Sequence, residues 1–396
     1  MKNNISNIKQ CYGCGVCTIA CAKKIIEIKL NKEGFYEPQI TDPTECTNCG
    51  LCIDVCAFSH KELSKKDENS TIKSWAAWSN DKHIQRKCSS GGIGFEIAQQ
   101  LIQQGYKLCA CRYNADKNRA EHYIATTVNE AIESIGSKYI QSYTADAFKA
   151  INRKEKYIVT GTPCQIDSFR RYIRRFHVEE NFVLLDFFCH CVPSMLAWEK
   201  YTQMVEKRTG KITYASWRNK ATGWHDSWAM AIDGEKGDTK NSCPNNGYNQ
   251  ALEERKTTYY SLLSKGDVFY SLFLGDYCHN PACEKNCKYK YKQSSADIRI
   301  GDLWGKTYKD NNEGVSALIA FTKKGSGIIE GLENVTLVKH PFEVVAEGQM
   351  KKNVHKAPTY TLVMCFLKSS IGFDSIIWHT LQLINRVAKR LYNIFK

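Results

Sequence analysis

Alternation of apolar and polar residues is clearest near the N-terminus. The stretch IIEIKLNKEGFYEPQI, from Ile25 to Ile40, alternates on both sides of Asn31–Gly34. A period of two residues is typical of β-strands, and Asn and Gly favour the turn between them. The pattern therefore predicts a β-hairpin within the first 60 residues.

The middle of the chain follows a different pattern. It predicts a Ser/Gly turn, a helix from about Ile93 to Gln104 and a strand around Lys107–Tyr113. A clearer unit follows: a strand at Tyr157–Thr160, a helix ending near Phe176 and a strand at Phe182–Phe188. This βαβ order favours parallel strands, so we expect an α/β main domain with a mostly parallel sheet.

The C-terminal tail reads as an amphipathic helix. Its apolar residues recur at helical spacing: Ile377, Leu381, Ile384, Ala388, Leu391 and Phe395. Arg386, Lys389, Arg390 and Lys396 occupy much of the rest, and no acidic residue follows Asp374. Two interpretations remain open. The apolar stripe docks on the protein, or the helix makes peripheral contact with an anionic membrane.

Charge and composition narrow the choice of function. The formal net charge is +14, and residues 350–396 contribute +7 of it, from eight Lys or Arg against one Asp. No nucleic-acid-binding motif accompanies this charge, so we expect no nucleic-acid partner. The N-terminus lacks the apolar core of a signal peptide, and no apolar run is long enough to span a membrane. We therefore expect a cytoplasmic protein, where its nineteen cysteines stay reduced.

Two runs of cysteines share one spacing. CYGCGVCTIAC and CTNCGLCIDVC both read C-x2-C-x2-C-x3-C, starting at Cys11 and Cys46. In two-cluster ferredoxins, the fourth cysteine of each run ligates the other cluster. We therefore assign Cys11, Cys14, Cys17 and Cys56 to one 4Fe–4S cluster, and Cys46, Cys49, Cys52 and Cys21 to a second. Zinc sites use two separated C-x2-C pairs or Cys/His mixtures, so zinc fits this pattern poorly.

Five short motifs in the main domain are informative because of the order in which they occur. They are SSGG before the helix at Ile93, GSKYIQS from Gly136, GTPCQI from Gly161, CHCVPS from Cys189 and ADIRIGDLWG from Ala296. In this order they resemble the β-subunit family of coenzyme F420 hydrogenases and dehydrogenases. The likeness covers roughly residues 75–358, with the ferredoxin-like unit as an N-terminal addition.

The resemblance implies an FAD site. Within it, the FAD phosphates are expected at the Ser/Gly turn, with further walls from the next two motifs. The residues implied are Ser89, Ser90, Gly91, Gly92, Ser137, Lys138, Tyr139, Gln141, Ser142 and Thr162. A Ser/Gly turn at a helix start also suits an anion on chemical grounds, although it is commonly an ordinary cap.

Four cysteines of the main domain are candidate ligands of a third 4Fe–4S cluster. They are Cys164, Cys189, Cys283 and Cys287, with Cys191 and Cys278 in reserve. Cys164 begins a helix, where a thiolate is stabilised. The alternative is four unrelated thiols, two of them on zinc. Two departures from the family bear on this set: Cys191 replaces a common Gly, and CEKNC has three residues between its cysteines rather than two.

These features predict four segments: a two-cluster 4Fe–4S ferredoxin-like α+β domain at 1–60, a linker at 61–75, an FAD and iron–sulfur domain at 76–358 and the basic tail at 359–396. Electrons would pass between clusters and FAD, with hydride transfer to or from a small-molecule substrate or an F420-like cofactor. His190 is the candidate proton donor. Ferredoxin or another redox protein is the expected partner. The alternative is a non-catalytic adaptor subunit that connects a partner enzyme to ferredoxin.

Overall fold

The N-terminal module is a small α+β unit built around the predicted hairpin. The computed structural model describes residues 3–64, 72–236 and 257–394, with the backbone alone from 388 to 394. Strands β1 (Ile26–Leu30) and β2 (Tyr36–Ile40) pair antiparallel, which confirms the hairpin. Two short helices, α1 (Val16–Ala20) and α2 (Leu51–Asp54), each follow a glycine in the left-handed region. Each helix lies inside one cysteine run.

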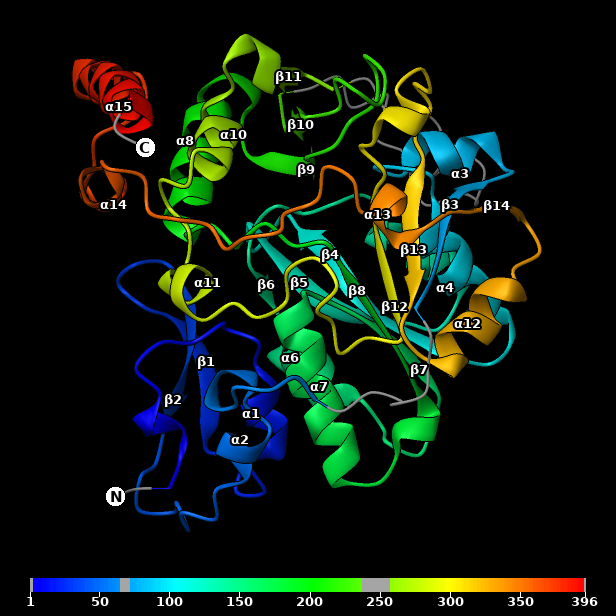
Figure 1. Cartoon of the computed structure of the whole chain (residues 1–396). Coiled ribbons are helices and arrows are strands. Elements are labelled where there is room, and N and C mark those ends of the chain that lie inside the picture. The colour runs from blue at the N-terminus through cyan, green and yellow to red at the C-terminus, as the bar shows by residue number, and fades with distance from the viewer. Residues whose placement is uncertain (1–2, 65–71, 237–256, 395–396) are drawn as a thin grey trace.

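The main domain is built on a nine-stranded mixed sheet, ordered β14-β3-β13-β12-β8-β7-β4-β5-β6 (Figure 1). Its strands are β3 (Lys73–Ser79), β4 (Lys107–Asn114), β5 (Arg119–Ala125), β6 (Ser142–Tyr143), β7 (Tyr157–Thr160), β8 (Phe182–Phe187), β12 (Ile298–Asp302), β13 (Ser316–Ala320) and β14 (Val335–Lys339). The predicted β7-α7-β8 unit is present, and its two strands pair in parallel.

The α/β class is confirmed, but the sheet is less parallel than expected. Its central strands β12, β8, β7 and β4 run parallel, whereas β14, β3 and β13 on one side and β5 on the other are joined by antiparallel pairings. The antiparallel pairings come from a hairpin between β4 and β5 and from pairing of β3 with β13 and β14, which are far away in the sequence. The local pattern of residues does not predict such pairings. Strand β3 begins at Lys73, inside the stretch expected to be a linker.

Helices cover both faces of this sheet. Helices α3 (Lys82–Lys87), α4 (Ile93–Gln103), α5 (Val128–Ala131) and α12 (Lys323–Glu330) pack on one face, where Leu108, Ile158 and Val183 point. Helices α6 (Ala145–Ala150) and α7 (Pro163–Arg175) pack on the other, over Val159 and Leu184. The N-terminal module lies against the α6 and α7 side (Figure 1).

A second lobe has its own core. It contains a three-stranded sheet, β9 (Ile212–Ser216), β10 (Ala229–Gly234) and β11 (Tyr259–Leu262), with α8 (Met195–Thr209), α10 (Val268–Leu274) and α14 (Tyr360–Lys368). Helices α11 (Pro281–Lys285) and α13 (Phe342–Val345) lie in the connecting segments. Short 3-10 turns occur at Ile5–Asn7, Ala57–Ser59, Ile132–Ser134, Glu179–Asn181, Leu263–Lys265 and Lys306–Tyr308.

The predicted C-terminal helix exists as α15 (Ile376–Ile394). Its packed face differs from the expected stripe. Leu381 is buried as predicted, but the other buried positions are Trp378 and Asn385, while Ile377 and Ile384 are exposed. The side chains of Ala388, Leu391 and Phe395 lie outside the described residues. Among the described residues, no helix combines the length and apolar character needed to cross a bilayer.

Candidate functional site

The first cysteine run is completed by a cysteine from the second. Burial raises the pKa of the Cys14 thiol to about 11, and the neighbouring Cys56 thiol adds to this rise. Burial likewise raises the pKa of Cys17, followed by the thiols of Cys14 and Cys11. Gly13 and Gly15 have positive φ, which lets the loop turn tightly around these sulfurs. Cys56 therefore lies with the first three cysteines, as crosswise ligation requires.

The second group is arranged in the same way. Burial raises the pKa of the Cys52 thiol, and the thiols of Cys49 and Cys21 raise it further. Cys46 Sγ accepts a hydrogen bond of 3.4 Å from Asn4 Nδ2. Cys21, from the first run, thus lies with the second run. Cluster assembly at either group requires thiolates, so binding iron would release the protons that burial now retains.

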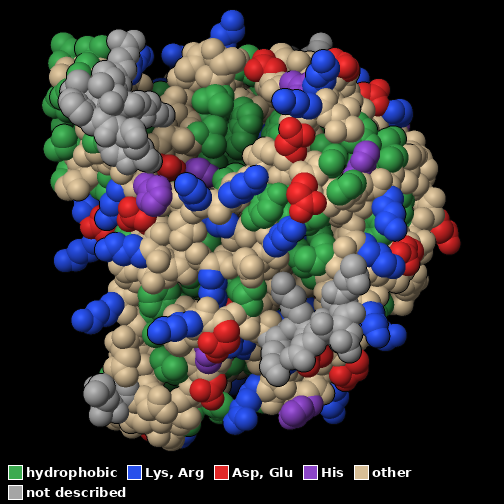
Figure 2. All heavy atoms as spheres, viewed as in Figure 1, with side chains coloured by type: hydrophobic (Ala, Val, Ile, Leu, Met, Phe, Trp, Pro, Cys, Tyr) green, Lys and Arg blue, Asp and Glu red, His purple; other side chains and the backbone are tan. Residues whose placement is uncertain are grey.

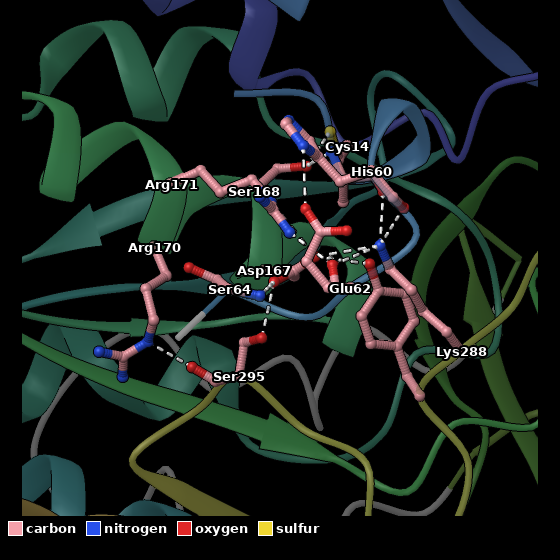
Figure 3. Close-up of polar contacts among 12 residues, drawn as sticks. Cys14, His60, Glu62, Ser64, Asp167, Ser168, Arg170, Arg171, Lys288 and Ser295 are labelled. Carbon is pink, nitrogen blue, oxygen red and sulfur yellow. Dashed lines mark hydrogen bonds and ion pairs between the residues drawn. The ribbon is translucent and has the colours of Figure 1, made fainter. Parts of the chain in front are cut away.

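A polar network fixes the N-terminal module to α7 (Figure 3). Asp167 is fully buried and accepts hydrogen bonds from Ser64 N–H at 2.8 Å and from Tyr289 Oη at 2.9 Å. The Oγ of its neighbour Ser168 accepts a hydrogen bond of 2.9 Å from Ala57 N–H. The same oxygen lies 3.4 Å from Cys14 Sγ. One turn of α7 therefore touches both the linker end and a candidate cluster ligand.

Four cysteines from three segments meet at the start of α7. Burial raises the pKa of Cys283 to about 12, with Cys189 as the next cause and Cys287 a further one. Burial also raises the pKa of Cys164 well above its usual value, with Cys189 and Cys283 among the causes. Burial therefore dominates the pKa of Cys164, whereas ligation of iron would require its thiolate. The grouping itself is the one that a third cluster needs.

Cys191 and Cys278 differ in position. The pKa of Cys191 is raised by burial and then by Cys283 and Cys189, so it lies beside the four-cysteine group. The pKa of Cys278 is raised to about 12 by burial, with Asp276 the only charged neighbour that contributes. Cys191 is the nearer reserve ligand.

Tyr12 lies between the two regions. Its pKa is raised by burial and then by the thiols of Cys164, Cys287, Cys283 and Cys56, in that order. One apolar cluster contains Tyr12, Ala57, Ala282 and Tyr289, with Cys164 and Cys287 packed against it. The N-terminal module and the four-cysteine group therefore share a dry boundary.

A second apolar cluster continues from the four cysteines into the main domain. Cys191, Cys283, Phe273 and Val354 form its core, and Tyr139 and Trp228 pack against it. The Tyr139 ring lies 5.3 Å from that of Phe273, and the Phe273 ring lies 5.3 Å from that of His190. His190 Nε2 is 2.9 Å from Asp276 Oδ1. The candidate cluster ligands therefore lie next to the aromatic ring of Tyr139. The candidate proton donor His190 lies on the other side of Phe273.

The glycines of the Ser/Gly turn are required by the fold itself. A Cβ on Gly91 would lie 2.4 Å from the Ala77 carbonyl oxygen, and Gly92 adopts φ of +88° before α4. Gly91 is therefore needed for packing and Gly92 for its backbone conformation, whatever the turn binds. Gly92 offers no side-chain cap to α4, and its carbonyl accepts from Phe95 N–H at 3.1 Å and from Glu96 N–H at 3.2 Å. An anion at this turn would therefore meet the preceding N–H groups and the positive end of the helix.

Ser89 and Ser137 join the turn to the second predicted wall. Ser137 N–H donates to Ser89 Oγ at 2.8 Å, and the two hydroxyls are 3.1 Å apart. Ser90 Oγ is engaged elsewhere, donating to the Val315 carbonyl at 2.8 Å. The predicted pair of motifs is therefore adjacent in space.

Two lysines flank this turn, and the sequence indicated only one. Burial lowers the pKa of Lys138 to about 8, and its Nζ donates to the carbonyls of Glu133, Ser134 and Ile135. Burial also lowers the pKa of Lys220 to about 8, and its Nζ donates to the Ser90 carbonyl at 2.9 Å. Both lysines influence the pKa of Cys88, the residue before the turn. No local motif marks Lys220.

The remaining predicted FAD residues lie apart from the turn. Gln141 accepts from Tyr36 N–H at 3.0 Å and donates to the Tyr12 carbonyl, so its amide holds the N-terminal module. Ser142 Oγ is bonded to His122 and Gln165, in the network that supports the start of α7. Thr162 Oγ1 is 3.2 Å from Cys164 Sγ. These three residues adjoin the cysteines rather than Ser89.

A buried arginine was also missed. Arg218 pairs with Asp302 at 2.8 Å, and its guanidinium lies 5.0 Å from the ring centres of both Trp228 and Trp304. Its Nη1 also donates to Tyr139 Oη at 3.3 Å. Arg218 therefore fixes Tyr139, and Asp302 acts as its counter-ion.

Comparisons with known proteins agree with the modules seen here. A model described as "Coenzyme F420 hydrogenase/dehydrogenase, beta subunit N-term" matches residues 74–149, and the model of the corresponding C terminus matches residues 154–342. A model of a 4Fe–4S dicluster domain matches residues 10–59. No curated protein matches the chain.

Among solved structures, one similar chain can be described. It belongs to the xenon-derivatised F420-reducing [NiFe] hydrogenase complex from Methanosarcina barkeri. The identity is 17%, the match covers 77% of this chain and 91% of that one, and the TM-score is 0.43.

Proposed function

The chain belongs to the coenzyme F420 hydrogenase/dehydrogenase beta subunit family and carries a 4Fe–4S dicluster domain, and on this basis we propose that it is an iron–sulfur flavoprotein oxidoreductase. In this proposal electrons pass between ferredoxin-type clusters and FAD, with hydride transfer to or from a small molecule or an F420-like cofactor. When bound, clusters carry single electrons and a flavin exchanges two as hydride, which is why the two groups occur together.

The observation that carries the proposal is the continuity of candidate sites. Tyr12 lies between the first ferredoxin-type group, which contains Cys56, and the four-cysteine group, which contains Cys164. Tyr139 packs against the apolar cluster that contains Cys283, a member of the four-cysteine group. We propose that Cys164, Cys189, Cys283 and Cys287 hold a third 4Fe–4S cluster on this path. Buried, closely grouped thiols suit such a ligand set, and the apolar boundary excludes water from the path.

The residues around the Ser/Gly turn fit a flavin pyrophosphate. The positive N-terminal end of α4, the hydroxyls of Ser89 and Ser137, and the buried charges of Lys138 and Lys220 all favour an anion. Tyr139, held by Arg218, is proposed to lie along a flavin ring. Thr162, Ser142 and Gln141 would then contribute from the cysteine side.

His190 is the proposed proton donor. Asp276 fixes the position of its Nε2, and the edge of its ring faces Phe273 beside Tyr139. A hydride acceptor reduced at this place needs a proton on its second atom, and an imidazole is suited to supply it. Asp276 is a positioning residue in this account.

The competing function is a non-catalytic adaptor that connects a partner enzyme to ferredoxin. It needs clusters but no flavin. The two are separated by anaerobic purification and absorbance: a bound flavin spectrum that bleaches with dithionite supports the enzyme, and iron without flavin supports the adaptor.

Two serine variants extend this experiment to the turn. Ser89→Ala and Ser137→Ala are expected to lower flavin content severalfold while iron content stays constant. Ser134→Ala is a matched control, because its hydroxyl bonds the Ala131 carbonyl in the same segment without touching the turn. Equal flavin in all three variants would remove the turn from the flavin site.

A further inference from the structure

Over its described side chains, from Ile376 to Val387, helix α15 has two apolar faces, and only one of them is covered. The covered face carries Trp378 and Leu381, and the Trp378 ring stacks on Phe366 of α14 at 5.0 Å. Asn385, on the same face, is hydrogen-bonded to Thr359. These contacts dock the helix on the second lobe.

The uncovered face is unusually apolar. Ile376, Ile377, Leu383, Ile384 and Val387 are between 45% and 83% exposed. Their spacing follows i, i+7 and i+11, so they form one stripe along the helix. Figure 2 shows apolar side chains gathered at the upper left, where Figure 1 places α14 and α15. Scattered exposed aliphatic residues need no explanation, but five on one helix do.

The chemistry of this stripe indicates what covers it. All five exposed side chains are aliphatic, and the one tryptophan of the helix points inward. Protein interfaces instead concentrate Trp, Tyr and Arg at their centres. The sequence from 375 to 396 contains Arg386, Lys389, Arg390 and Lys396 and no acidic residue. An aliphatic stripe beside basic residues complements acyl chains beneath anionic headgroups.

We propose that α15 lies in the plane of an anionic lipid surface, with the stripe from Ile376 to Val387 immersed and the exposed Arg386 at the headgroups. The helix would not cross the bilayer, and the Trp378 face would keep it attached to the second lobe. The observation does not depend on the oxidoreductase proposal.

Vesicle co-sedimentation of the full-length protein tests this. We expect binding to vesicles of phosphatidylcholine with phosphatidylglycerol, weakened as salt rises, and little binding to phosphatidylcholine alone. The triple variant Arg386→Gln/Lys389→Gln/Arg390→Gln should lower the partition constant on the order of 100-fold, about fivefold per charge. The variant Leu383→Ser/Ile384→Ser/Val387→Ser should lower it at least about tenfold, because each change removes immersed apolar area.

A matched control removes three exposed lysines elsewhere, with Lys309→Gln/Lys323→Gln/Lys352→Gln. This control should bind anionic vesicles nearly as well as the parent. Absence of vesicle binding, or equal losses in the control and the α15 charge variant, would overturn the proposal. A protein that does not bind vesicles but forms a concentration-dependent dimer in sedimentation velocity would also overturn the proposal, if the serine variant abolishes that dimer. The stripe would then be a contact between two copies.

Discussion

The Ser168 hydroxyl oxygen lies 3.4 Å from the sulfur of Cys14 and accepts a hydrogen bond from Ala57 N–H. Because the Ala57 amide uses an acceptor position, the hydroxyl proton is free to point at the sulfur. As a thiol, Cys14 donates to Ser168 Oγ, but a ligating thiolate has no proton and would accept from Ser168. Hydrogen bonds to cluster sulfurs tune reduction potentials.

Ser168→Ala should therefore lower the reduction potential of the cluster assigned to Cys11, Cys14, Cys17 and Cys56. Loss of the donor removes a partner that stabilises the more negative, reduced cluster. The measurement is a redox titration followed by electron paramagnetic resonance. Ser168→Thr should restore most of the potential.

Stability alone does not distinguish this role, so a control is needed. Ser295→Ala removes a 2.6 Å hydrogen bond to Asp167 in the same buried network but touches no sulfur. It should lower the free energy of unfolding by about 1 kcal/mol and leave the potential unchanged. An identical shift in both variants would mean that the network acts only by holding the fold.

Asp167→Asn tests how the N-terminal module is attached. Asp167 is completely buried and lies within 4.0 Å of the charged groups of Arg171 and Lys288. Removing its charge leaves two partly buried cations without their partner, which typically costs about 3 kcal/mol. Denaturant unfolding should show this loss, with iron content unchanged in the native protein. Asp146→Asn, at an exposed position of α6, should have almost no effect; a matching loss there would contradict the assignment.

Flavin binding should depend on pH through two lysines. Burial lowers the pKa values of Lys138 and Lys220 to about 8, so both lose charge as pH rises past 8. A phosphate favours their protonated forms, so binding should take up protons. Affinity for FAD should fall up to roughly fivefold per lysine between pH 8 and pH 9.

Calorimetry of FAD binding in buffers of different ionisation enthalpy measures this proton uptake. Lys220→Met should flatten the pH dependence. Lys200→Met is the control: Lys200 also donates to backbone carbonyls, those of Ser369 and Ile371, but in the second lobe. A pH-independent affinity would place the phosphates away from both lysines.

The sequence predicted those parts of the fold that depend on residues close together in the chain. Alternation located the hairpin and the β7-α7-β8 unit, and cysteine spacing predicted that Cys56 lies with the first run. Both signals span few residues. The edge strands of the sheet and the exposed stripe of α15 depend on distant packing, so they were not predicted.

The candidate flavin site shows the same division. Sequence motifs brought Ser89 and Ser137 together correctly, but Lys220 reaches the turn from 130 residues away. The Ser/Gly turn was predicted to hold phosphate, and the structure adds that the carbonyl of Ala77 excludes a side chain at Gly91. Asp302 belongs to the last of the five motifs, but its ion pair with Arg218 is visible only in the structure.

The central claim is a continuous path from two ferredoxin-type clusters through a third to the flavin. Iron analysis of anaerobically purified protein tests it most directly. Three 4Fe–4S clusters predict about twelve iron atoms per chain, and Cys164→Ser or Cys283→Ser should reduce this to about eight while the ferredoxin-type signals persist. A count near eight in the parent, unmoved by either substitution, would contradict the path.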